Sequence, residues 1–496
     1  MDRRTFIRSM ILTATSASLM PACQQQKAAK DGYNPAHVDH PADLPLPAGK
    51  RVPFEWQAFA VPEPGGNGPV LRWNIRPLEQ PSRLRVTTAI DGREEKLVEV
   101  LLAESGDKIG ELDLRFAPVL EPFEILLSAV QTRQVLEQGV RLSMRIGSSP
   151  VWFFKPSGDS GEKQTLMPHL WISDDSDPLT AFHDRLASLN SLQPYGWMEG
   201  CVLDGLYDLW KSTGQDRYHA ALQAHLDHFF NDEQRLIYES PRSEPLDGIV
   251  TGIESTLPNA IIAKLDPQHP VLDDVVQFWL NTRDSENSVQ DGQTTSAEGS
   301  YTVGYPMMVI GQAREDRELI QLAVQQIRIR KKRLIYNGDC WLRYHGGDSR
   351  TYRNWARGVA WYGLGLVRTL IQGRSMTGLD DLKQEVERLA GWVQGYQQED
   401  GLWRCFLHEK VRPDTSGSAG IAAALALAIK HDFLSDSYLT MCQRTRDGLI
   451  SHLTPDGLLT GVAQSNRGGE SLQRSDYRVI SPMGMGLMAQ LISALP

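Results

Sequence analysis

The chain has 496 residues, of which 41% are hydrophobic and 23% charged, the usual balance of a soluble globular protein. This length exceeds one average domain and predicts two domains together with a short terminal segment. The formal net charge is −10, and the sequence contains no stripe of Lys and Arg residues. This excludes a nucleic-acid-binding surface, because an acidic protein repels phosphates.

The first 23 residues have the pattern of an export signal. Arg3 and Arg4 precede a short apolar run, Met10–Met20, and Cys23 follows it. A charged start and a run too short to span a membrane are typical of a secretory signal. The paired arginines resemble a twin-arginine signal, and the cysteine resembles a lipoprotein site. We therefore expect an exported protein, periplasmic or at the cell surface, whose only membrane contact is a lipid on Cys23, with a polar tether over residues 24–45.

Between residues 46 and 176, apolar and polar residues alternate over short runs that Gly, Pro or Asp often separates. The runs are 52–61, 71–75, 84–90, 96–103, 110–116, 123–130, 140–146 and 151–154. Seven or eight short strands with turn residues between them predict an antiparallel β-sandwich. No catalytic pattern occurs there, so we expect this domain to pack beside the catalytic one and shape its cleft, with glycan binding as the alternative.

From residue 177 to residue 496 the apolar pattern becomes helical and repeats. Six apolar helices rich in small residues begin after polar or Gly-containing clusters, near Gly196, Gly252, Glu298, Trp355, Ser416 and Ser481. Amphipathic helices follow, for example over 216–230, 273–281, 317–332 and 379–396. Each hairpin then pairs an inner helix, buried on both sides, with an outer helix that exposes one face to solvent. Six such hairpins predict an (α/α)6 barrel. The alternative is an open helical solenoid. In the barrel the inner helices begin at one end, where free N–H groups and helix dipoles favour a carboxylated sugar.

Four further cysteines lie in predicted helices or beside apolar residues and form no CxxC pair: Cys201, Cys340, Cys405 and Cys442. We expect buried free thiols rather than a zinc site or disulfides. No set of His and carboxylate residues stands out as a ligand set, so neither a metal ion nor an organic cofactor is expected.

The densest group of polar and aromatic residues lies over 339–362. Arg357 offers a two-pronged donor that matches the carboxylate of a uronic acid. Trp355 and Trp361 present flat faces on which a sugar ring stacks, and His345 is a donor for a sugar hydroxyl. Taken singly, these residues also fit core tryptophans, a salt-bridged arginine and a turn histidine, but the whole cluster favours a sugar site. Aromatic residues at two other helix starts complete the predicted substrate-binding set: Trp197 and Tyr301.

Several elements of the helical region resemble glycoside hydrolase families 88 and 105, the unsaturated glucuronyl and rhamnogalacturonyl hydrolases. The element WARGVAW at residues 355–361 is similar to a motif of these families, except that Ala360 stands where the families have Gly. Residues 195–200, 399–403 and 456–461 resemble their first, fifth and last hairpins. The resemblance covers about residues 180 to 496 and leaves out the β-rich region.

This resemblance implies a mechanism. Substrates of these families end in a 4,5-unsaturated uronic acid left by a polysaccharide lyase. An acid protonates the double bond, water adds to the resulting cation, and the hemiketal opens and releases the next sugar. One carboxyl group must act as acid and then as base, and a second must orient substrate or water. Burial near another carboxylate raises the pKa of such an acid enough to keep it protonated.

In these families both carboxyl groups are aspartates at the starts of inner helices. Asp247 matches the supporting aspartate, and Glu254 is a close rival for that role. Glu298 stands, with a shift of one residue, where the families have an aspartate shortly before a proline, here Pro306. The resemblance therefore implies that Glu298 is the acid and base.

The substitution of Glu for Asp leaves two other functions open. A pair of carboxylates can hydrolyse a saturated uronide on the same fold, as a glucuronidase does. The other is a lipid-anchored glycan-binding protein that has lost catalysis, in which the aromatic residues would still stack on sugars. The leading prediction is an enzyme that removes a terminal unsaturated uronic acid from acidic oligosaccharides.

Overall fold

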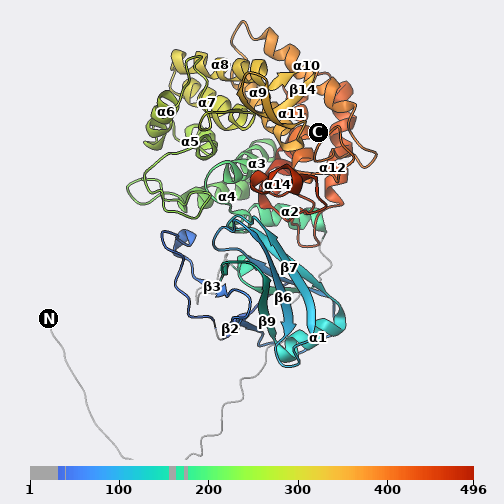
Figure 1. Ribbon diagram of the computed structural model, residues 1–496. Helices are drawn as coiled ribbons and strands as arrows, with labels where there is room; N and C mark the ends of the chain where they lie inside the picture. Colours follow the sequence, from blue (N-terminus) through green and yellow to red (C-terminus); the bar gives the residue numbers. More distant parts are fainter. Residues whose placement is uncertain (1–31, 40, 156–163, 173–176) are drawn as a thin grey trace, which may run out of the picture.

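The computed structural model describes residues 32–39, 41–155, 164–172 and 177–496, and the predicted export signal and Cys23 lie outside them. Figure 1 shows two parts, a β-rich N-terminal part and a larger helical part packed against it. Most of the secondary structure is helical, and the β-rich part is antiparallel, as predicted.

The β-rich part contains two larger antiparallel sheets. One has the order β1 (Gly32–Pro35), β11 (His169–Ile172), β5 (Ser82–Thr87), β8 (Pro122–Leu127). The other has the order β2 (His37–Asp39), β4 (Val70–Arg72), β9 (Val140–Ile146), β6 (Glu95–Leu102), β7 (Lys108–Arg115). A further pair joins β3 (Ala58–Val61) to β10 (Val151–Phe154). Apolar side chains from both larger sheets form one core. They reach it because side chains point alternately to the two faces of a sheet along each strand.

Two predictions for this part are corrected. Strands β1 and β2 lie inside the predicted tether 24–45 and pair with β11 and β4. They are sheet edges with few apolar residues, so no alternation marked them. The run predicted as a strand over 123–130 ends at Leu127, because Ser128 caps helix α1 (Ala129–Gln138) through reciprocal hydrogen bonds with Gln131.

The helical part is a closed ring of inner helices. In order around the ring these are α3 (Trp197–Thr213), α5 (Asn259–Leu265), α7 (Tyr305–Ala313), α9 (Ala356–Gln372), α11 (Thr415–Lys430) and α14 (Pro482–Ala494). Helix α14 packs against α3, so the described helices do not form an open solenoid. This closure requires glycine, because a Cβ on Gly205 would lie 2.6 Å from the carbonyl oxygen of Gly486. The six inner helices begin within a few residues of their predicted starts, except that short helical turns precede α5 and α7.

Each inner helix contacts an outer, amphipathic helix. The outer helices are α2 (Pro178–Leu186), α4 (Asp216–Asp227), α6 (Val271–Asn281), α8 (Arg317–Leu334), α10 (Asp380–Gln394) and α12 (Leu439–Ile450). Four of these match the predicted amphipathic helices. The four cysteines expected as free thiols are buried and form no disulfide, as predicted.

The β-rich part is fixed to the ring by buried ion pairs. Arg85 on β5 donates to Asp456 at 2.6 Å, and Arg185 on α2 also binds this carboxylate. Glu121 accepts two hydrogen bonds of 3.0 Å from the side-chain amide of Gln464. These contacts place the loops of the β-rich part beside the starts of the inner helices. Among the described helices, none combines the length and the apolar character needed to cross a bilayer.

Candidate active site

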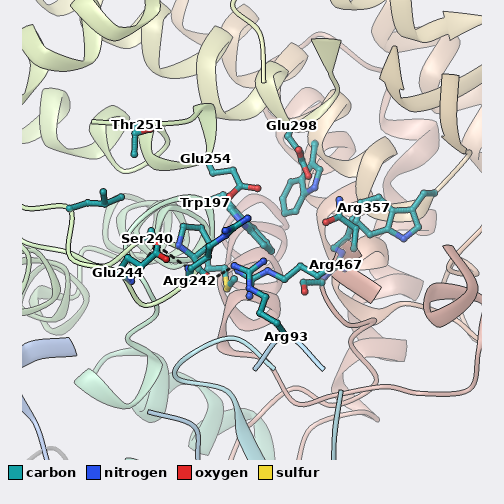
Figure 2. Close-up of a pocket in the computed structure, with 17 residues that line it drawn as sticks. Arg93, Trp197, Ser240, Arg242, Glu244, Thr251, Glu254, Glu298, Arg357 and Arg467 are labelled. Carbon is teal, nitrogen blue, oxygen red and sulfur yellow. Dashed lines mark hydrogen bonds between the residues drawn. The ribbon is translucent and has the colours of Figure 1, made fainter. Parts of the chain in front are cut away.

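A cavity of about 460 Å³ opens where the inner helices begin, and Figure 2 shows the residues that line it. A second chamber of about 510 Å³ shares part of its wall, including Trp197, Glu254 and Arg467. These volumes suit one or two sugar rings. The predicted site residues that line the first chamber are Trp197, Glu254, Glu298, Trp355, Arg357 and Trp361.

These residues come from the starts of four inner helices. Trp197 is the first residue of α3, and Glu254 lies in the turn η4 (Ile253–Thr256) before α5. Glu298 precedes α7, and Arg357 lies in the first turn of α9. The predicted convergence of helix starts at one end of the ring is therefore observed.

Glu298 follows a short strand and precedes an unusual helical turn. Strand β12 (Thr295–Ser296) pairs with β14 (Asp339–Gly346), and the π-helical turn η5 (Ser300–Gly304) leads into α7. Gly299 is required here, because an added Cβ would lie 2.1 Å from a guanidinium nitrogen of Arg330. A π-turn holds one residue more than an α-turn, so five residues, Ser300–Gly304, separate Gly299 from the start of α7.

The carboxyl group of Glu298 is poised to hold a proton. Burial raises its pKa to about 7; Arg343 opposes this shift, and Glu254 and Asp291 add to it. Oε2 of Glu298 is buried and has no hydrogen-bond partner among the described residues. Such a group can donate a proton to a substrate near neutral pH.

Glu254 is the second carboxyl group of the cavity. Its pKa is raised, first by burial and then by the neighbouring charge of Asp291, while Arg467, Arg343 and Arg93 oppose the shift. In Figure 2 the carboxyl groups of Glu254 and Glu298 reach into the same space. The two carboxyl groups interact, because the charge of Glu254 adds to the rise in the pKa of Glu298.

Asp247, predicted as a supporting carboxylate, lines neither chamber. Arg51 binds it with both Nη atoms, each at 2.7 Å, and this pairing lowers the pKa of Asp247. Asp247 lies in the loop between α4 and η4, where Gly248 has a φ of +69° and turns the chain. The structure therefore separates Asp247 from Glu298 and places Glu254 in the cavity.

The aromatic wall is built on α9. Trp355 is buried and its indole Nε1 donates to Gln473 Oε1 at 3.1 Å. The guanidinium carbon of Arg357 lies 4.7 Å from the ring centroid of Trp355, and one of its Nη atoms donates to the Gln464 carbonyl. Trp361 meets Trp197 edge to face with ring centroids 5.5 Å apart. These contacts orient the flat residues and the arginine before any sugar enters.

Two predicted sugar contacts are not in the cavity wall. Tyr301 is fully buried; it stacks behind Trp361 with centroids 6.0 Å apart and donates to Asp204 at 2.5 Å. His345 is exposed near the end of β14, with a 3.0 Å hydrogen bond between its Nε2 and Thr351 Oγ1, and lines neither chamber. Helix geometry placed Tyr301 near the site but could not show that Trp361 covers it.

Sequence analysis missed several residues of the cavity wall. Arg93 comes from the β-rich part, and Ser240 and Arg242 come from the loop after α4. Arg467 comes from the short 3-10 turn η7 (Asn466–Gly468), just before α13 (Gly469–Arg474). They lie in irregular segments far apart in the chain, so no spacing or periodicity connects them. In the part of the chain that the structure describes, no group of three His, Cys, Asp or Glu side chains is placed to hold a metal ion.

Comparison with known proteins agrees with this geometry. The model of Glycosyl Hydrolase Family 88 matches residues 179–493, which is more than half of the chain. The chain belongs to this family. It is therefore a glycoside hydrolase, and the β-rich part lies outside the family match.

Solved structures share the fold of this family member at low sequence identity. A family 105 glycoside hydrolase of C. acetobutylicum ATCC 824 is 17% identical, with a TM-score of 0.56 over 64% of this chain and 98% of that one. A family 88 glycosyl hydrolase of Bacteroides vulgatus is 13% identical, with a TM-score of 0.50 over 64% and 96%. A protein described as a polysaccharide lyase is 15% identical, with a TM-score of 0.52 over 64% and 95%.

Proposed function

We propose that this family 88 member removes a terminal unsaturated uronic acid from oligosaccharides produced by polysaccharide lyases. The observation that carries the proposal is Glu298, a buried carboxyl group without a hydrogen-bond partner among the described residues and with a pKa raised to about 7. It stands beside a second carboxyl group, Glu254, in a chamber walled by tryptophans. A protonated carboxyl group at neutral pH is what protonation of a carbon–carbon double bond requires.

The proposed reaction is hydration of that double bond. Glu298 gives its proton to C4 of the sugar, and positive charge develops at C5, which is bonded to the ring oxygen. A water molecule adds at C5 while the Glu298 carboxylate takes one of its protons, so the acid is restored. The hemiketal at C5 opens to a ketone, and the hemiacetal left at C1 releases the next sugar. Glu254 orients the water and stabilises the developing positive charge.

The substrate is proposed to bind through its carboxylate and its ring face. Arg357 presents a guanidinium that is pre-oriented on Trp355, and its Nε has no hydrogen-bond partner among the described residues. A guanidinium edge matches the two oxygens of a uronate. Trp197 and Trp361 offer apolar surface for the ring, and Tyr301 holds Trp361 in place from behind.

The ring of six inner and six outer helices supports an (α/α)6 barrel, and the two antiparallel sheets with one core support a β-sandwich. We also propose that the protein is exported and anchored by a lipid on Cys23. The support for this location is the charged start, the short apolar run and the cysteine that follows it.

A hydrolase of saturated uronides is the second candidate, because Glu254 and Glu298 form a carboxyl pair of the kind that ordinary glycosidases use. Matched disaccharides with saturated and unsaturated uronyl ends separate the two, with chromatography of the released second sugar as the readout. Release from the unsaturated substrate alone supports the proposal, and release from the saturated one alone contradicts it. Sugar binding without release from either would indicate a glycan-binding protein that has lost catalysis.

A further inference from the structure

Three arginines crowd the cavity wall opposite the catalytic carboxyl groups. Arg93, Arg242 and Arg467 all line the first chamber, and Figure 2 shows Arg93 and Arg467 on the other side of the open space from Glu254 and Glu298. Arg242 and Arg467 also line the second chamber, whose wall includes neither Arg357 nor Glu298. This arginine group therefore lies along the path that leads away from the proposed uronate site.

The three arginines have few direct ion-pair partners among the described residues. Asp91 is shared, because its Oδ2 lies 2.7 Å from Nε of Arg93 and 3.9 Å from an Nη atom of Arg467. Arg93 also donates to the Pro241 carbonyl at 2.6 Å, which fixes its guanidinium across the loop. Glu244, the other acidic residue on this side of the wall, pairs with Lys50 at 3.4 Å. Among the described residues, Asp91 is the only carboxylate paired with these guanidiniums, while Glu121 and Glu254 act on Arg467 from farther away and Arg242 has no ion pair.

A segment beside the arginines presents buried donors without partners. Within the described residues, the Ser465 hydroxyl, the Asn466 side-chain amide nitrogen and Nη1 of Arg467 are all buried and lack a hydrogen-bond acceptor. Ser465 is only 8% exposed. Tyr352 anchors the segment by donating to the Asn466 carbonyl at 3.1 Å. Buried donors left unpaired are unfavourable, and an anion with several acceptor oxygens would satisfy them together.

We propose that Arg93 and Arg467, with the Ser465–Arg467 segment and Arg242, bind a second anionic group, a sulfate ester or carboxylate on the sugar next to the terminal uronyl residue. This inference rests on the proposed function, which puts the uronate between Arg357 and Glu298 and directs the next sugar toward the second chamber. Guanidinium groups and hydroxyl or amide donors are the usual ligands of such oxyanions. The β-rich part then contributes directly to substrate selection through Arg93, although it lies outside the family match.

The test uses unsaturated uronyl disaccharides that differ only in the second sugar, which is neutral, sulfated or carboxylated. The ratio of kcat/KM for an anionic substrate to kcat/KM for the neutral one is measured for the parent, Arg93→Gln and Arg467→Gln. The control is Arg133→Gln, on helix α1 away from the cavity, where the arginine pairs with Glu79. Comparing the ratio of the two kcat/KM values cancels any general loss of activity in a variant. Arg93 is exposed, so its replacement does not threaten folding.

We expect the parent to prefer one anionic substrate by roughly 10- to 100-fold, the range that one or two charge-assisted hydrogen bonds supply. Arg93→Gln and Arg467→Gln should each lower this ratio about tenfold, while Arg133→Gln keeps it. The anion that is preferred identifies the group as sulfate or carboxylate. A parent without preference, or a preference that both arginine variants retain, would overturn the second anion site alone. No release from any of the three substrates would overturn the proposed function and, with it, this site.

Discussion

Arg51 holds Asp247 through both Nη atoms at 2.7 Å and contacts Glu239 through Nε at 2.5 Å. This arrangement joins the start of the β-rich part to the loop that leads into the second inner helix. It uses both oxygens of Asp247, and Asp247 lines neither chamber. Asp247 is therefore a residue of the contact between the two parts.

The first prediction separates Asp247 from Glu254. Asp247→Asn should leave kcat within about threefold of the parent and lower the free energy of unfolding by about 1 kcal/mol or less, because the ion pair is partly exposed. Glu254→Gln should lower kcat by roughly 10²- to 10⁴-fold, the usual loss when an acid–base group is removed. Steady-state kinetics and urea denaturation measure both effects. A large loss of kcat in Asp247→Asn with normal kcat in Glu254→Gln would reverse the assignment.

The second prediction concerns pH. Burial raises the pKa of Glu298 to about 7, so this carboxyl group is protonated below that pH and ionised above it. Since the acid form starts the proposed reaction, kcat should fall as the pH rises through about 7. A pH profile of kcat on an unsaturated disaccharide measures this. A rate that instead increases across the same range would mean that the ionised form acts first.

The third prediction tests the role of Tyr301 behind the cavity. Tyr301→Phe keeps the ring that stacks on Trp361 but removes the hydroxyl group that donates to Asp204. The free energy of unfolding should fall by about 1–3 kcal/mol, because Asp204 loses a buried donor. KM should change less than about twofold, whereas Trp361→Ala should raise KM or abolish activity. A raised KM with unchanged stability in Tyr301→Phe would instead indicate direct contact with the sugar.

The fourth prediction concerns His345, which lies outside the cavity wall. Its side chain is exposed and bonds to Thr351 on the neighbouring strand β15 (Ser349–Arg353). His345→Ala should therefore leave kcat/KM within about twofold and the melting temperature nearly unchanged, as exposed substitutions usually do. A tenfold loss of kcat/KM would show that this hairpin moves over the bound sugar.

The fifth prediction concerns export. Cys23→Ser should remove the fatty acid and shift the protein from the membrane fraction to the soluble exported fraction, because this cysteine is the proposed acylation site. Labelling with a radioactive fatty acid followed by fractionation measures both changes. Equal membrane association of the parent and the variant would contradict a lipid anchor on Cys23.

The sequence predicted the helical part well because its signals are periodic. Small apolar residues repeat in each inner helix, and the clusters that precede the helices mark their starts within a few residues. Arg357 was found in the polar and aromatic cluster at one of those starts, and the resemblance to families 88 and 105 pointed to Glu254 and Glu298 at two others. The same resemblance pointed to Asp247, which lines neither chamber. Nothing in the local sequence reveals the arginine 196 residues away that binds it.

The missing residues of the site belong to irregular segments. Arg93 lies in a loop and Arg467 in a short 3-10 turn, where side-chain position depends on how the β-rich part docks on the ring. Such docking depends on contacts like that between Arg85 and Asp456, which are 371 residues apart. Strands β1 and β2 were missed for a related reason, because edge strands need not alternate in polarity.

The most direct test of the central claim is the loss of ultraviolet absorbance from unsaturated uronyl oligosaccharides made with several lyases. We expect the parent and Asp247→Asn to bleach the absorbance of at least one oligosaccharide group, because hydration removes the conjugated double bond. Glu298→Gln should fail to do so while it keeps the parent's fold and melting temperature. Absorbance that the parent leaves unchanged on every oligosaccharide, or that Glu298→Gln removes as fast as the parent, would contradict the account.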